Sequence, residues 1–152
     1  MGIKRYGDDE ISASLPNYKF RISSPVFKKK GEDFNIDFYE GVLKTNPYLV
    51  ECLNYLGNAY TTKGMYQEGL EVDKKLAKLR PEDSVIIYNL ACSYSLTHEV
   101  SLAISALEKA IDLGYDDIEQ IENDSDINNL RDDKRYKDLM EILRKKSVGI
   151  IV

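Results

Sequence analysis

The amino-acid sequence predicts an all-α fold built from repeated pairs of helices. The main observation is a 34-residue period, seen first in the two prolines Pro47 and Pro81. A shift by this period aligns Leu56 with Leu90, Gly57 with Ala91, and Tyr60 with Tyr94. Within each copy, apolar or small residues recur at i, i+3, i+4 and i+7, the spacing of an amphipathic helix. A period of this length indicates a solenoid in which each repeat is one helix pair.

The two copies also share a local motif. Each has Leu, a small residue and then Tyr in the order L-[GA]-x-x-Y, followed nine positions later by a second small residue, Gly69 or Ala103. This pattern, with the closing Pro81, resembles the tetratricopeptide repeat (TPR), and the resemblance implies a short right-handed solenoid that binds proteins. The chain departs from the family in having no tryptophan and in placing Asp73 where the family usually has an aromatic residue; Leu107 fills that place in the second copy.

The N-terminal residues 1–32 are expected to form an extended arm, since glycine, proline and serine interrupt any helical pattern there. The arm combines basic and aromatic residues, and it either docks onto a partner, packs along the repeats or stays mobile. The expected contact residues are Tyr18, Phe20, Arg21, Phe27, Lys28, Lys29 and Lys30.

The remaining elements follow from the repeat register, and together they make a TPR domain over residues 33–146. Residues 33–46 are the second helix of a half repeat; two full repeats follow at 47–80 and 81–114, with helix–helix turns at Lys63-Gly64 and Thr97-His98. Residues 115–146 are a degenerate third repeat that caps the solenoid, as such arrays require. The apolar tail 147–152 either folds back on the cap or contacts a partner.

Charge is distributed unevenly along the chain. Residues 1–30 hold seven basic and three acidic side chains, so the net charge of −5 leaves −9 on residues 31–152. An acidic body repels a phosphate backbone, so nucleic acid is not the expected partner. There is no apolar run of roughly 18 residues, the minimum for a membrane span, and no secretory signal. A cytoplasmic protein is therefore expected, with Cys52 and Cys92 as reduced, half-buried thiols.

The sequence contains little that could carry catalysis, and no catalytic residue, metal site or cofactor is expected. The single histidine, His98, falls in a helix–helix turn. Asp124-x-Asp126-x-Asn128 begins like a calcium loop, but Asn129 replaces the glycine and Arg135 the final acid, which favours helix capping instead. An enzyme is therefore only a remote alternative.

The concave side of a solenoid is lined by the first helix of each pair, and this is the expected binding surface. Asparagine suits an extended peptide because its amide both donates and accepts hydrogen bonds; the alternative is that these amides only hold neighbouring helices together. The expected groove residues are Glu51, Asn54, Asn58, Thr61, Thr62, Tyr88, Asn89, Cys92 and Ser95.

One branch of the TPR family clamps the terminal carboxylate of a peptide, and this chain matches only part of that clamp. Two asparagines of the clamp match Asn58 and Asn89. Its basic positions, however, correspond to Asn54, Glu119 and Asn123. Without those cations, carboxylate binding is not implied for this chain.

The expected function is a non-catalytic protein–protein interaction module that acts as a scaffold or assembly subunit of a multi-protein complex. The alternative is an adapter that binds an extended client peptide in the groove. Partners would be proteins, among them larger enzyme subunits or a second copy of the chain.

Overall fold

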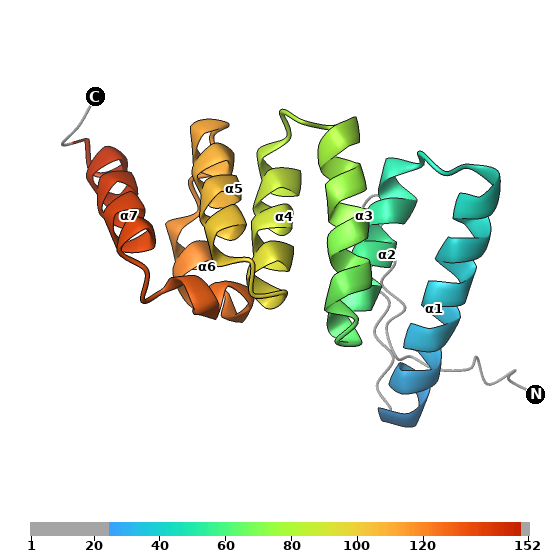
Figure 1. The fold of residues 1–152 in the computed structure, drawn as a ribbon. Coiled ribbons are helices and arrows are strands. Elements are labelled where there is room, and N and C mark those ends of the chain that lie inside the picture. The colour runs from blue at the N-terminus through green and yellow to red at the C-terminus, as the bar shows by residue number, and fades with distance from the viewer. Residues whose placement is uncertain (1–24, 150–152) are drawn as a thin grey trace, which may run out of the picture.

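The computed structural model describes residues 25–149, with side chains from residue 35 onward. These residues form a row of helices and no strand, which confirms the all-α prediction (Figure 1). The elements are α1 (Pro25–Thr45), α2 (Val50–Thr62), α3 (Tyr66–Leu79), α4 (Ser84–Leu96), α5 (Val100–Asp112), α6 (Ile118–Asn123), the 3-10 helix η1 (Ser125–Leu130) and α7 (Lys134–Ser147). None of the described helices is both long and apolar enough to cross a membrane.

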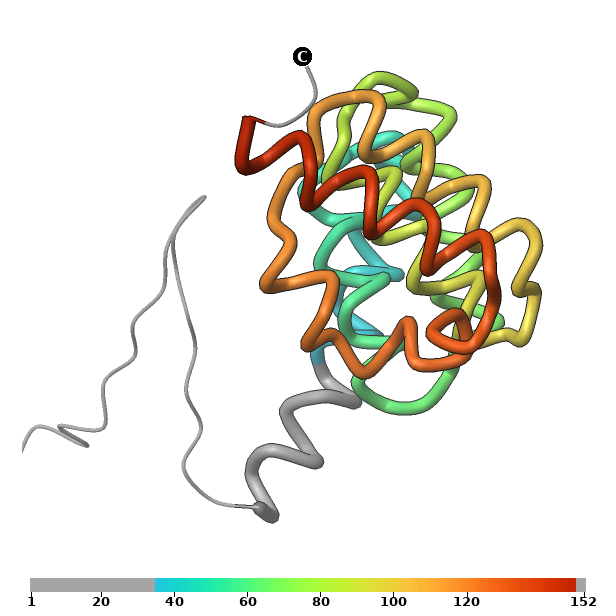
Figure 2. Tube along the Cα trace, turned by 90° about the vertical axis from the view of Figure 1, so that its left-hand side faces the viewer, coloured from blue at the N-terminus to red at the C-terminus, as the bar shows by residue number. Residues whose placement is uncertain are grey.

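The helix boundaries reproduce the 34-residue period. Helix α4 begins and ends one full period after α2, and α5 begins one full period after α3. Each helix packs against the next one along the chain, from α1 through α5. Figure 2 looks along the row from the α7 end and shows the helix pairs stacked behind one another. The solenoid predicted from the period is therefore confirmed.

Two adjoining clusters of buried side chains form the core. One lies between α1 and α4 and contains Leu56 and Tyr60; the other joins α4 and α5 to the cap and contains Leu107 and Met140. Small residues let the helices of the first pair approach closely. A Cβ on Gly57 would stand 3.2 Å from Oδ1 of Asp73, a tight contact, and 3.4 Å from a methyl carbon of Val72, so little space is left at this crossing.

The turn between the two helices of each pair has the same geometry in both repeats. Gly64 and His98 both have positive φ, 79° and 64°. In the first turn the N–H of Met65 donates to the carbonyl of Tyr60 at 2.8 Å, and in the second the N–H of Glu99 donates to that of Tyr94 at 2.8 Å. These bonds satisfy the carbonyl groups left open at a helix end.

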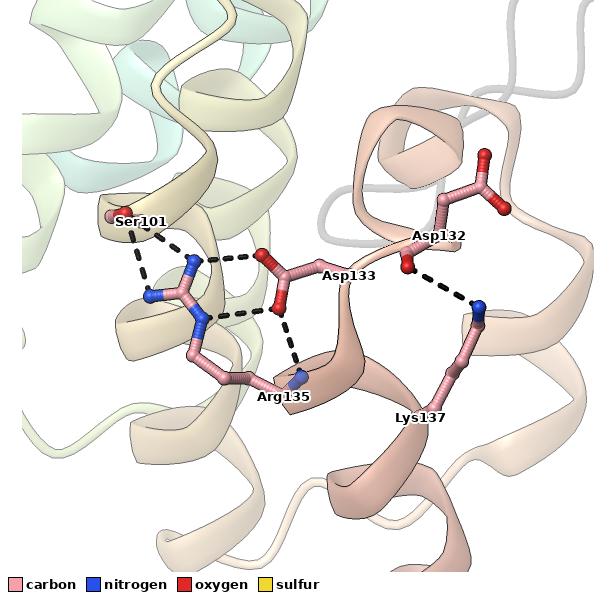
Figure 3. A network of polar contacts seen from close by, with 5 residues as sticks. All are labelled: Ser101, Asp132, Asp133, Arg135 and Lys137. Carbon is pink, nitrogen blue, oxygen red and sulfur yellow. Dashed lines mark hydrogen bonds and ion pairs between the residues drawn. The ribbon is translucent and has the colours of Figure 1, made fainter.

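The cap is fastened to α5 by a polar network (Figure 3). The carboxylate of Asp133 accepts from the backbone N–H of Arg135 at 2.8 Å and pairs with the guanidinium of that residue at 2.7 Å. The Arg135 hydrogen bonds hold the pKa of Asp133 down at about 2. The same guanidinium donates to Ser101 of α5 at 3.3 Å, so capping and docking of α7 share one arginine.

The structure corrects the expected boundary of the arm and describes only part of the arm and of the tail. Helix α1 begins at Pro25, so residues 25–32 are helical and the expected arm boundary at residue 32 is wrong. Tyr18, Phe20 and Arg21 lie outside the described residues, whereas Phe27 and Lys28 to Lys30 lie in α1 without described side chains. In the tail, Val148 is 68% exposed, and residues 150–152 lie outside the described part.

Equivalent leucines of the two repeats differ in burial, and this difference can be measured. Leu56 is 4% exposed, whereas Leu90 is only half-buried and belongs to neither core cluster. Leu56→Ala should therefore cost about 2–5 kcal/mol of unfolding free energy, and Leu90→Ala clearly less. Urea unfolding monitored by circular dichroism measures both; equal losses would contradict the packing described here.

The left-handed conformation of His98 should cost stability that glycine would restore. A side chain in this conformation costs roughly 1–2 kcal/mol, so His98→Gly should raise the midpoint of urea unfolding. The matched control is Gly64→His at the equivalent position, which should lower it. If both changes shift the midpoint in the same direction, the two turns do not share one geometry.

Candidate functional site

A pocket of about 160 Å³ lies on the face formed by α2, α4 and the cap, and we call it the groove pocket. It contains six of the nine residues expected in the groove. These are Asn54, Asn58 and Thr61 from α2, and Tyr88, Asn89 and Cys92 from α4. The repeat register therefore brings amides of two successive repeats to one surface, as the sequence predicted.

The other three expected residues do not line the groove pocket. Glu51 and Thr62 are exposed on α2, where the Thr62 hydroxyl donates to the carbonyl of Asn58 at 2.8 Å. The expectation for Ser95 is wrong, because this side chain is fully buried. The cap covers it: Asn129 of η1 donates its amide N–H to the Ser95 carbonyl at 2.8 Å.

Several lining residues were not anticipated. Asp73 and Ser93 reach the groove pocket from the contact between α3 and α4, and the cap adds a further set of polar residues. That set is Tyr115, Gln120, Asp124 and Asp126. The sequence did mark Asp73 as unusual, because this polar residue occupies a repeat position that usually holds an aromatic residue. The cap residues had no such signal, since the interrupted third repeat leaves their register undefined.

Asp73 is the most buried carboxyl group of the site. Its side chain is 8% exposed, and its Oδ2 accepts a hydrogen bond from the Ser93 hydroxyl at 2.5 Å. Burial raises the pKa of Asp73 from 3.8 to about 6, although the Ser93 bond partly opposes this. The carboxylate is charged at neutral pH while it is largely withdrawn from water, an unfavourable state unless a donor or cation compensates it.

Asp124 organises the cap side of the groove pocket. Its Oδ2 accepts from the Tyr88 hydroxyl at 2.8 Å and from the Gln120 amide at 3.2 Å, and its Oδ1 accepts from the backbone N–H of Asp126 at 2.9 Å. The last bond caps η1, the role that the sequence favoured over a calcium loop. The ring of Tyr88 stacks on Tyr115 with centroids 4.2 Å apart and planes within 8°.

The chemistry of the groove pocket is that of hydrogen bonding. Cys52 and Cys92 are free thiols, and both are buried rather than half-buried. Burial is the main cause that raises the pKa of Cys92 far above its ordinary value, so the thiolate needed for nucleophilic attack is suppressed. Among the described residues, no group of three histidine, cysteine or acidic side chains is placed to hold a metal ion. Carboxylate and amide oxygens line the groove pocket and can accept hydrogen bonds.

Comparison with known proteins identifies the fold. No family model matches the chain. It is 36% identical over 88 residues to a curated chloroplastic protein of Arabidopsis thaliana, a match that covers 56% of this chain and 26% of that protein. The chain thus spans about a quarter of the length of this curated relative.

Among the solved structures that the chain resembles are two of MamA: "MamA 41-end" from Desulfovibrio magneticus RS-1 and the "MamA RS-1 ArsTM double mutant". For each, the TM-score is 0.58, the identity 19%, and the match covers 80% of this chain and 71% of that one. The likeness agrees with the helix pairing described above. The fold is an all-α, TPR-like solenoid.

The buried carboxyl group should make stability depend on pH with a definite sign. The folded state holds the proton of Asp73 up to about pH 6, whereas the ordinary pKa is 3.8. Between these values the folded state binds more protons than the unfolded state, so stability falls as pH rises. Asp73→Asn should remove much of that fall and stabilise the protein at neutral pH.

Urea unfolding of both proteins at a series of pH values measures this effect. Asp126, half-buried and with a raised pKa, adds a smaller change of the same sign. Asp116→Asn, an exposed neighbour outside the groove pocket, is the control and should leave the pH profile unchanged. A wild-type profile that rises through the same range would show that Asp73 is not buried as described.

Proposed function

We propose that this protein is a non-catalytic protein–protein interaction module that acts as a scaffold or assembly subunit, and that its groove receives an extended segment of a partner protein. The observation that carries the proposal is the groove pocket, in which two repeats and the cap contribute to one polar surface. Asn58 is exposed and Asn89 half-buried there. The side-chain amides of both residues line the groove pocket and can pair with a peptide backbone. At Asn58, the bond from Thr62 uses only the main-chain carbonyl and leaves the side chain to the groove.

The arrangement of reactive groups argues against an enzyme. A nucleophile is commonly activated by a neighbouring histidine base, a lowered pKa or a metal ion. The only histidine, His98, is exposed in the turn between α4 and α5, away from the lining of the groove pocket. Cys92 lies in the pocket, but the carboxylate of Asp124 stands 3.8 Å from its sulfur, which disfavours a thiolate.

A second contact surface at the α1 end favours the assembly role over simple peptide capture. Phe38 is 53% and Tyr48 67% exposed, and Tyr39 stacks on Tyr55 with centroids 5.4 Å apart. Exposed large aromatic side chains of this kind are typical of protein interfaces. With the groove, they would let one small subunit contact two larger ones, or a second copy of itself.

Site-specific photo-crosslinking tests the groove. A photoreactive residue in place of Asn89 should capture a protein partner from the native cell extract. The same residue in place of Lys109, exposed on α5 and outside the groove pocket, should not. Asn58→Ala should reduce the yield obtained from position 89, since it removes a lining amide. Equal capture from both positions, or capture from 109 alone, would contradict the proposal.

Deleting residues 1–24 separates the contribution of the N-terminal arm to partner binding from that of the groove in the same assay. The deletion stops before α1 and leaves every described helix intact. If the arm helps to hold a partner, the crosslinking yield at position 89 should fall. Unchanged yield would remove the arm from the proposed assembly role and leave the groove as the binding surface.

A further inference from the structure

We propose that the groove pocket takes a cationic side chain, arginine in preference to lysine, from the extended segment of a partner protein. This inference rests on the proposed function and adds the chemistry that the partner must present. It depends on four features of the groove pocket: its uncompensated carboxylates, an open acceptor on Asp73, an aromatic wall, and the charge of the surrounding domain.

The first feature is that no described side chain forms an ion pair with the carboxylates of the groove pocket; the Arg131 guanidinium contacts Asp124 only through its backbone carbonyl, at 2.8 Å. Asp73, Asp124 and Asp126 all line it. Among the described side chains, the ion pairs within 4.0 Å join other residues, on α3 and in the cap. Carboxylates that are partly withdrawn from water and share one pocket are stabilised when a positive charge enters it.

The second feature is an acceptor atom of Asp73 that is open to the groove pocket. This side chain is 8% exposed and lines the groove pocket, yet only its Oδ2 accepts a hydrogen bond, from Ser93. Its Oδ1 has no donor among the described residues. It faces the bare backbone of α2, 3.2 Å from the point where a Cβ on Gly57 would stand. This oxygen is not fully enclosed, since Ser95 Oγ is the described side-chain atom that is both buried and without a hydrogen-bond partner. An N–H entering the pocket can therefore reach Oδ1 and bond to it.

The third feature explains the preference for arginine. A guanidinium is planar, carries five N–H donors and stacks on aromatic rings, whereas an ammonium is a compact, strongly hydrated charge. The groove pocket offers carboxylate oxygens on Asp73 and Asp126 and amide oxygens on Asn58 and Asn89. The stacked pair of Tyr88 and Tyr115 forms part of its wall, which supplies an aromatic surface for a cation.

The fourth feature is the charge around the groove pocket. Residues 31–152 carry a net charge of −9, and a field of this sign draws basic segments toward the molecule. The rival occupant is the N-terminal segment of this same chain that precedes α1, residues 1–24, which holds four basic side chains against three acidic ones. We commit to a partner segment, and deletion of the N-terminal segment distinguishes the two.

The test uses the full-length chain and short serine–glycine peptides that differ only at a central residue: arginine, lysine, or neutral citrulline, which keeps the shape of arginine. Binding is followed by NMR through the side-chain amide signals of Asn58 and Asn89. The arginine peptide should bind roughly tenfold more tightly than the citrulline peptide, as expected for a hydrogen-bonded charge. The lysine peptide should fall between them.

Two matched variants locate the effect. Asp126→Asn removes one charge from the groove pocket and should weaken the arginine peptide by roughly tenfold. Asp116→Asn removes the same charge from an exposed residue outside the lining and should leave the affinity nearly unchanged. Equal losses in the two variants would reduce the effect to general electrostatics and overturn the proposal.

Failure of this inference can be told from failure of the proposed function. If arginine and citrulline peptides shift the Asn58 and Asn89 signals with equal affinity, the groove binds peptides and the cation preference is wrong. If free agmatine shifts these signals but no peptide does, the cation site stands and peptide binding fails.

A roughly tenfold gain in affinity for the arginine peptide after deletion of residues 1–24 would overturn the assignment to a partner, by showing that the chain's own arm fills the pocket. Unchanged affinity after the deletion supports it.

Discussion

The structure depends on the burial of one helix stripe against the next. None of α2 to α5 can bury its apolar face alone, and each is completed by its neighbours in the row. Close approach within the first pair requires a small residue at Gly57, and the equivalent place of the second pair holds Ala91, which is fully buried. Because this packing repeats with the period of the sequence, the lining side chains of successive first helices also repeat. The groove is a consequence of the packing.

The cap bounds one end of this repeated surface. Helix α6 starts a third repeat but ends at Asn123, and Asp124 then stands at the position that Leu56 and Leu90 occupy in the complete repeats. A carboxylate at that position cannot join an apolar core. It instead accepts hydrogen bonds from Tyr88 and Gln120 and fixes the wall of the groove pocket. The degeneration of the third repeat is therefore what supplies its polar end.

The sequence was sufficient for the parts of the fold that periodicity controls. Helices α2 to α5 and both turns follow from the 34-residue register, and so do the asparagines of the groove. Glycine, proline and serine in residues 1–32 predict no helix, yet α1 begins at Pro25, because proline is well suited to the first turn of a helix. The position of Ser95 in the repeat predicts that it faces the groove, but here the cap covers this position. Asp73 was recognised as an irregular residue, but only its burial beside Ser93 shows that it belongs to the site.

The central claim is that two stacked repeats and their cap form one surface that binds other proteins. Hydrogen–deuterium exchange of the full chain, with and without a partner captured through position 89, tests it most directly. We expect exchange to slow in α2, in α4 and in the segment from α6 to η1, the elements that supply most of the lining of the groove pocket. Protection confined to α5 and α7, with α2 and α4 unchanged, would contradict the account.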